Sequence, residues 1–186
     1  MHRPKLPKFA EARVWTDELP DYAVMIGESS PLLTVAASGT IPDRAAAVEW
    51  LIPLGPRSLY GLLGARLCPN ENGCLIEIIE EKPTRAVAET IASRVSESAL
   101  VGMLPEYAAA VKRGAEAVLA ARPALPACRI TFCAAVVGEV GSCEAIFENL
   151  ARVVLELLLS PSLPSEAELP GLLIYQAPAP RSAAVL

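Results

Sequence analysis

The strongest constraint in this sequence is a pair of long amphipathic segments that flank one apolar run. Apolar side chains recur at helical spacing over 105–121 and again over 142–159, which predicts two helices that each bury one face. Between them, 128–137 is a long apolar run and is predicted to be a strand. This order favours a sheet that carries both helices on one face.

Residues at the start of each segment support both helices. Pro105 suits a first helical turn, where its missing N–H is not needed, and Glu106 beside it favours the helix dipole. Ser142 is the predicted cap of the second helix, and Glu144 lies in its first turn. A turn over 137–141 separates this helix from the preceding strand.

The rest of the chain predicts more strands and two more helices. Short apolar runs bounded by turn residues predict strands at 22–26, 32–38, 62–68, 74–80 and 172–175. Asn72 and Gly73 predict a hairpin that joins the strands on either side of them. Helices are expected over the Ala-rich run 43–51 and the periodic run 83–98.

These elements predict one α+β domain over 21–176. Residues 1–20 carry several basic and proline residues, and we expect a flexible basic arm, with a nucleic-acid-binding arm as the alternative. The Pro/Ala-rich end, 177–186, is predicted to be a frayed tail.

Composition excludes several function classes. Hydrophobic residues make up 53% of the 186 residues, which favours a packed core over disorder. The net charge of −5 argues against a protein that coats nucleic acid, although a local basic patch is compatible with it. The most apolar stretch, 150–159, is too short to span a bilayer, so no membrane association and a cytoplasmic location are expected.

Residues for common catalytic and metal sites are scarce. His2 is the single histidine, only three aspartates occur, and no phosphate-binding glycine loop is present. The five cysteines form no Cys-x-x-Cys pair and are expected to be free thiols. We therefore predict no catalytic residue, no metal and no cofactor.

Two groups of residues leave an alternative open. Cys143 lies at the start of a predicted helix, whose amide dipoles would stabilise a thiolate, so a nucleophile is the alternative to a structural cysteine. Glu77, Glu80 and Glu81 are expected to form a solvated charge cluster, with a metal or general-base site as the alternative.

One motif is more specific than the rest. Residues 102–114 contain the order P-E-Y-x-x-A-V-x-x-G, and the strand and turn that follow lead into the Ser-rich helix start 142–147. With these features, 102–158 resembles the fourth domain of translation elongation factor G. The resemblance implies a two-layer sandwich of sheet and helices, to which the helix 83–98 and an N-terminal extension are added.

In that family, two loops at the tip of the domain enter the ribosomal decoding centre beside tRNA and mRNA. The resemblance places the tip at 56–61 and 137–143, and it puts the family's tip histidine at Gly138 and its aspartate at Gly141. The predicted tip-loop binding residues are Arg57, Ser58, Tyr60, Glu139, Ser142 and Cys143. The sequence has no GTPase domain, so we expect a stand-alone, divergent relative.

Two functions follow as hypotheses. The first is a non-enzymatic binding module that acts on the ribosome, on RNA or on a translation partner. The alternative is a module for protein interaction or self-association that keeps only the fold. An enzyme on this fold would need a Gly/Ser-rich phosphate loop that opens a helix, and 138–142 is too meagre an example of one.

Overall fold

The computed structural model describes residues 1–6, 10–37, 39, 41–71, 73–122 and 124–176. They form an open eight-stranded sheet whose main path runs β1-β3-β4-β8-β5-β2, with β7 pairing to β8 and β6 to β7. The strands are β1 (Glu11–Thr16), β2 (Ser29–Val35), β3 (Arg44–Leu54), β4 (Arg57–Pro69), β5 (Cys74–Ile79), β6 (Arg85–Val87), β7 (Ala99–Val101) and β8 (Cys128–Gly138). The pairing of β5 with β8 is parallel and the other pairings are antiparallel.

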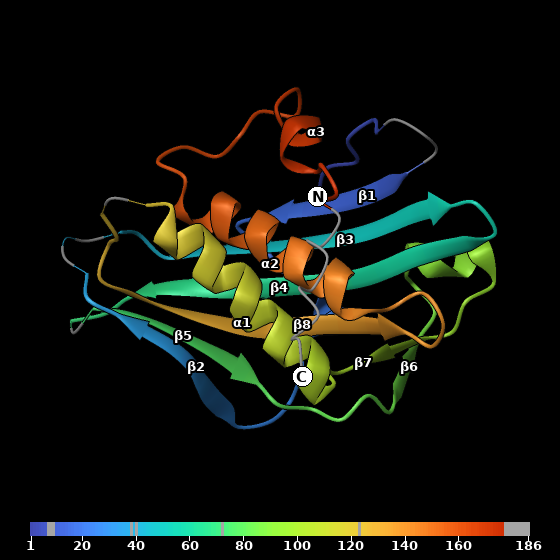
Figure 1. The fold of residues 1–186 in the computed structure, drawn as a ribbon, viewed down its shortest axis with the longest axis horizontal. Helices are drawn as coiled ribbons and strands as arrows, with labels where there is room; N and C mark the ends of the chain where they lie inside the picture. The colour runs from blue at the N-terminus through green and yellow to red at the C-terminus, as the bar shows by residue number, and fades with distance from the viewer. Residues whose placement is uncertain (7–9, 38, 40, 72, 123, 177–186) are drawn as a thin grey trace, which may run out of the picture.

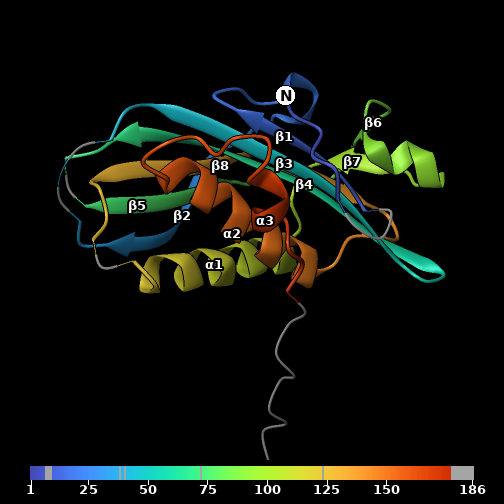
Figure 2. The same ribbon diagram turned by 90° about the horizontal axis from the view of Figure 1, so that it is seen from above.

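Two long helices cover one face of the sheet, which makes the fold α+β (Figures 1 and 2). They are α1 (Pro105–Ala120) and α2 (Glu144–Leu159), and a short helix α3 (Leu169–Leu172) follows them. α2 packs on β3 and β4, and α1 packs beside α2. Among the described residues, no helix has the length and apolar character needed to cross a bilayer.

Alternation along β3 and β4 divides their side chains between the two faces. A Cβ atom added at Gly61 would lie 3.0 Å from Leu150 of α2, so Gly61 and its cross-strand partner Trp50 face the helices. Because successive residues of a strand point to opposite faces, Glu49 and Tyr60 face the back of the sheet.

Two irregular segments cover this back face. The first, 17–28, contains the short helix η1 (Asp21–Ala23), and its Leu19 lies 3.0 Å from the position of a Cβ atom added at Gly64. The second, 88–98, contains η2 (Ile91–Val95), and the Ile91 N–H donates to the Glu49 carboxylate over 2.8 Å. The half of the sheet near β3 and β4 is therefore buried on both sides.

The motif of 102–114 builds the contact between α1 and α2. Tyr107 stacks on Phe147, with ring centroids 4.8 Å apart, and its hydroxyl donates to the Ser142 carbonyl over 3.1 Å. A Cβ atom added at Gly114 would lie 2.4 Å from the carbonyl oxygen of Glu148. Glycine at this position is thus what lets the two helix backbones approach each other.

The N-terminal segment differs from the flexible arm that was expected. Residues 11–16 form β1, because Val14 and Trp15 have buried side chains and the strand completes a ladder with β3. The domain therefore begins before residue 21. The tail predicted at 177–186 lies outside the described residues.

The helix predicted over 43–51 is wrong, since 44–51 belong to β3. The alanines favour a helix. In the structure, however, β3 pairs along its length with β4, so Val48, Trp50 and Ile52 point to one face of the sheet and the residues between them to the other. Tertiary pairing on both edges overrides the local preference of alanine.

The strands of the predicted hairpin exist as β4 and β5, but they do not pair with each other. β8 lies between them, antiparallel to β4 and parallel to β5. A two-stranded hairpin would leave both apolar strands without a buried neighbour on one edge, whereas the apolar β8 supplies one to each. Asn72 of the expected turn lies outside the described residues.

Three further expectations are wrong. The helix predicted over 83–98 is β6 and η2, and it ends at Ser96, whose left-handed conformation (φ 55°) stops the turn. The strand predicted over 22–26 is η1 and one β-bridge from Val24 to Ala134. No strand forms at 172–175: Leu172 is the last residue of α3, whose first turn contains Pro170, and 173–175 have no regular secondary structure.

The helix contact predicts an unusual response to alanine. Gly114→Ala adds about 1 kcal/mol of helix propensity, yet the new methyl group would overlap a backbone oxygen of α2. We expect a net loss of about 1–3 kcal/mol in the free energy of unfolding, measured by urea denaturation. Gly171→Ala is the control, because a Cβ atom there meets nothing within 4 Å. Equal stability of the two variants would contradict the close contact.

Candidate functional site

The two predicted tip loops meet at one end of the sheet, where β3 turns into β4 and the chain passes from β8 to α2 (Figure 1). A cleft of about 470 Å³ lies there. Five of the six predicted binding residues line it: Arg57, Ser58, Glu139, Ser142 and Cys143. A third segment, 95–98, which the sequence placed in a helix, completes the lining.

Tyr60 supports the tip from below and does not line the cleft. Its side chain is fully buried on the back face, where the phenol donates to Glu49 Oε1 over 3.0 Å. Its backbone N–H donates to the Gly141 carbonyl over 3.0 Å, and its carbonyl accepts from Ser142 Oγ over 2.8 Å. Tyr60 therefore joins the loop before α2 to the edge of β4.

Ser142 closes this loop and does not act as the expected helix cap. Its hydroxyl accepts the N–H of Gly138 over 2.8 Å and donates to Tyr60. The N-cap residue is Cys143, in extended conformation and without a side-chain capping bond. The serine hydroxyl is thus committed to loop structure.

The centre of the tip loop holds the carboxylate of Glu97. Glu97 Oε1 accepts the N–H of Val140 over 2.9 Å and also the N–H of Gly141. Cβ atoms added at Gly138 and Gly141 would lie 2.2 and 2.7 Å from the two carboxylate oxygens. Glycine at both positions therefore leaves the space that the carboxylate fills.

The surface of the tip is apolar and weakly acidic. Val140 is 84% exposed and Val95 43% exposed, and both line the cleft. Arg57 is the sole cation among the described residues of the lining, against Glu97 and Glu139. The loop amides that could hold an external anion are already paired with Glu97.

Coupling between Glu97 and Gly138 can be measured. Gly138→Ala alone is expected to destabilise the chain by about 1–3 kcal/mol, because the methyl group displaces the carboxylate. In the double variant Gly138→Ala/Glu97→Ala the clash is absent. Its loss of stability should therefore be smaller than the sum of the losses in the two single variants, by about 1 kcal/mol or more. Urea denaturation of both single variants and the double variant gives this difference. Additive losses would show that the carboxylate does not occupy the glycine pair.

A polar cluster lies under η2, behind the tip. Glu49 is fully buried and accepts hydrogen bonds from the Tyr60 hydroxyl and the Ile91 N–H. Arg13 Nη1 lies 3.4 Å from Glu49 Oε2. The Tyr22 hydroxyl and the Thr90 hydroxyl are also buried, without a hydrogen-bond partner among the described residues.

Burial dominates the ionisation of this cluster. Loss of solvent raises the pKa of Glu49 above 4.5, although the Ile91 N–H and Arg13 partly oppose the rise. Burial and the Glu49 charge raise the pKa of Tyr22 to about 12 and move the pKa of Tyr60 in the same direction. These groups fasten η2, and with it the segment that carries Glu97, to the sheet.

The raised pKa of Glu49 makes stability depend on pH. Between pH 4.5 and the higher folded pKa, the folded chain binds this proton more tightly than the unfolded chain, so the free energy of unfolding falls as pH rises. The fall is about 1.4 kcal/mol for each unit by which the pKa is raised. We expect the stability difference between wild type and Glu49→Gln to decrease across this interval in urea titrations. A stability difference that stays constant across this interval would contradict the burial effect.

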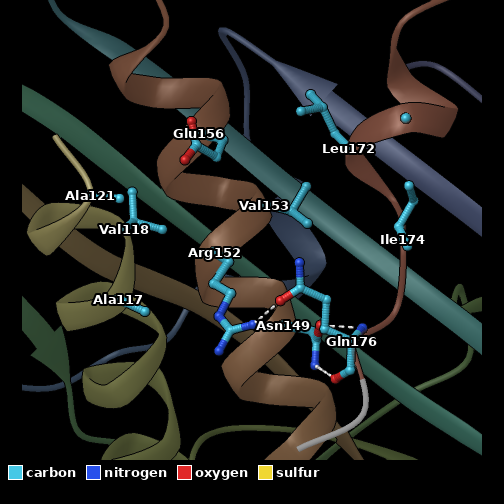
Figure 3. Close-up of a pocket in the computed structure, with 11 residues that line it drawn as sticks. Ala117, Val118, Ala121, Asn149, Arg152, Val153, Glu156, Leu172, Ile174 and Gln176 are labelled. Carbon is cyan, nitrogen blue, oxygen red and sulfur yellow. Dashed lines mark hydrogen bonds between the residues drawn. The ribbon is translucent and has the colours of Figure 1, made fainter.

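A second hollow, of about 570 Å³, lies between α1, α2 and the segment 171–176 (Figure 3). Asn149 projects from α2 toward Gln176, accepting its N–H and donating to its carbonyl, each over 2.9 Å. The Asn149 amide also donates to the Ala145 carbonyl. The polar groups of this groove hold the C-terminal segment against α2, so we do not place the site here.

A third hollow, of about 730 Å³, lies between β2, β5 and the start of α1. Leu32, Ile78 and Met103 give it an apolar lining. At its rim, the Glu81 carboxylate accepts the Ile26 N–H and lies 3.9 Å from Arg85. It offers volume but no converging polar groups.

The cysteines and the acidic residues of the predicted cluster contact other side chains of the sheet. Within the described ranges, no group of three metal-binding side chains occurs. Glu77 pairs with Arg129 at 3.8 Å, on the sheet. The buried thiols of Cys74 and Cys128 lie 3.6 Å apart, and the hydrogen bond from Cys128 lowers the pKa of Cys74.

The chain matches no model of a known protein family and no curated protein. The candidate site is therefore defined by its geometry. Sequence reasoning missed Glu97 and Glu49. Glu49 could have been noticed as a lone charge within the apolar run 45–54, but no local signal connects Glu97 to a loop some forty residues away in the sequence.

Proposed function

We propose that this chain is a non-enzymatic binding module that docks through its tip cleft onto a protein surface of the translation apparatus. The observation that carries the proposal is the Glu97 carboxylate, which pairs with the amides of the tip loop. A loop closed in this way presents side chains to a partner and not free N–H groups.

The charge of the tip favours a protein over a phosphate backbone. Contacts to phosphates depend on lysine and arginine, and the described lining offers only Arg57. The exposed Val95 and Val140 instead supply apolar area of the kind that fills the centre of a protein interface. Glu139 at the rim would select a partner with a basic edge.

The proposal that the partner belongs to the translation apparatus rests on the resemblance of 102–158 to the fourth domain of elongation factor G. Residues that carry the resemblance, such as Tyr107, Phe147 and Gly114, form the helix contact that supports the tip. A ribosomal protein or a translation factor is the proposed partner, and the cytoplasm the corresponding location. Self-association through the same valines is the second candidate.

Co-sedimentation with purified ribosomes tests the proposal. We expect the chain to sediment with ribosomes at physiological salt, and Val140→Asp to reduce the bound fraction about tenfold through the charge it adds to the cleft. Ile26→Asp is the matched control, because Ile26 is 79% exposed and lies outside the cleft lining. No co-sedimentation, or equal loss in both variants, would refute this function.

Salt dependence and light scattering separate the alternatives. Docking on a protein should persist when salt is raised several-fold, whereas contact through RNA phosphates weakens steeply with salt and would be sensitive to Arg57→Ala. Light scattering of the free chain should give a monomer at all concentrations. A dimer that Val140→Asp dissociates would favour self-association.

A further inference from the structure

The basic N-terminal segment folds onto the outer edge of the sheet. His2 and Val14 exchange two backbone hydrogen bonds, of 2.7 and 2.9 Å, which form a β-bridge beyond β1. His2 Nε2 also lies 3.3 Å from Thr16 Oγ1. The bridge holds Arg3 and Lys5 beside β1, although their charged side chains remain exposed.

A small pocket of about 280 Å³ lies between this segment, β1 and η2. Its charged lining consists of Arg3, Lys5, Arg13, Arg94 and Glu11. Four cations thus face one carboxylate, in a chain whose net charge is −5. The charge of this pocket is opposite to that of the molecule.

The pairing of these charges leaves an excess. Arg94 forms an ion pair with Glu11, and Arg13 lies 3.4 Å from the buried Glu49. Arg3 and Lys5 form no ion pair with any residue in the described part of the chain. Like charges gathered in this way repel one another, and a bound anion would relieve that repulsion.

Arg13 is a fixed part of the pocket lining. Its Nη1 is used, since it donates to the Glu89 carbonyl over 2.7 Å. Its Nε is buried and has no hydrogen-bond partner among the described residues. The contacts of Nη1 with the Glu89 carbonyl and the Glu49 carboxylate therefore fix the Arg13 guanidinium at the wall of the pocket.

We infer that this pocket binds a phosphate group. Guanidinium groups match the oxygens of phosphate with paired hydrogen bonds, and a lysine adds a further charge-assisted donor. The volume suits a phosphate or a diphosphate moiety and is too small for a whole nucleotide cofactor. The same chemistry would recognise a free phosphate compound or a single phosphate of a nucleic acid, and the site is independent of the tip cleft.

Calorimetric titration of the full chain with inorganic pyrophosphate tests the site. We expect binding in the millimolar range or tighter, which weakens about tenfold in the double variant Arg3→Ser/Lys5→Ser. The matched control is Arg66→Ser/Lys112→Ser, which removes the same two charges from β4 and from α1. Both double variants change exposed side chains and should unfold at the wild-type temperature.

A parallel titration with a short labelled single-stranded RNA distinguishes the two sources of phosphate. If RNA binds and the Arg3/Lys5 variant alone weakens it about tenfold, the site serves a nucleic acid; if pyrophosphate alone shows this pattern, it serves a free phosphate compound. The assignment would be overturned if the RNA does not bind and pyrophosphate does not bind at concentrations up to about 10 mM. It would also be overturned if both double variants weaken binding of the probe equally. Val140→Asp should leave both titrations unchanged, so failure of the tip proposal would not affect this result.

Discussion

The structure depends on the insertion of β8 between β4 and β5. This strand pairs with β4, β5 and β7, and most of its residues are buried. Because α1 precedes β8 and α2 follows it, one central strand sets the position of both helices on the sheet. Its last residue, Gly138, also begins the tip loop. Core packing and the candidate site therefore share one element.

A second constraint acts from the back of the sheet. Glu49, buried beneath η2, holds the Ile91 N–H, and six residues later Glu97 holds the amides of the tip loop. The segment 88–98 thus connects a buried carboxylate on the sheet with a carboxylate in the loop. Its Glu97 carboxylate occupies the amides of the tip loop, and the Val140 side chain of that loop remains exposed. The basic pocket at the N-terminus lies against the other side of η2, at Ile91 and Arg94.

The local pattern of apolar residues was sufficient to predict those elements whose pattern agrees with the way they pack in the fold. Both long helices and β8 were predicted within a few residues, because helical or continuous apolar patterns there agree with the tertiary packing. The pattern predicted the wrong structure at β3. Its alanines favour a helix, but the segment forms a strand because it pairs with β1 on one edge and with β4 on the other. In the candidate site, Arg57, Ser58 and Cys143 were anticipated because they follow from the predicted loops, while Glu97 depends on a contact that no spacing reveals.

The sequence by itself determined the α+β class, the helix–strand–helix unit and the glycines at 138 and 141. Only the tertiary structure decided that β8 separates β4 from β5, that Glu97 fills the space at those glycines, and that the basic N-terminal residues face Arg94. The physical reason is the range of the interactions. Helix periodicity and turn preferences arise within a few residues, whereas strand order and buried ion pairs gain their energy from groups that become neighbours only when the chain has folded.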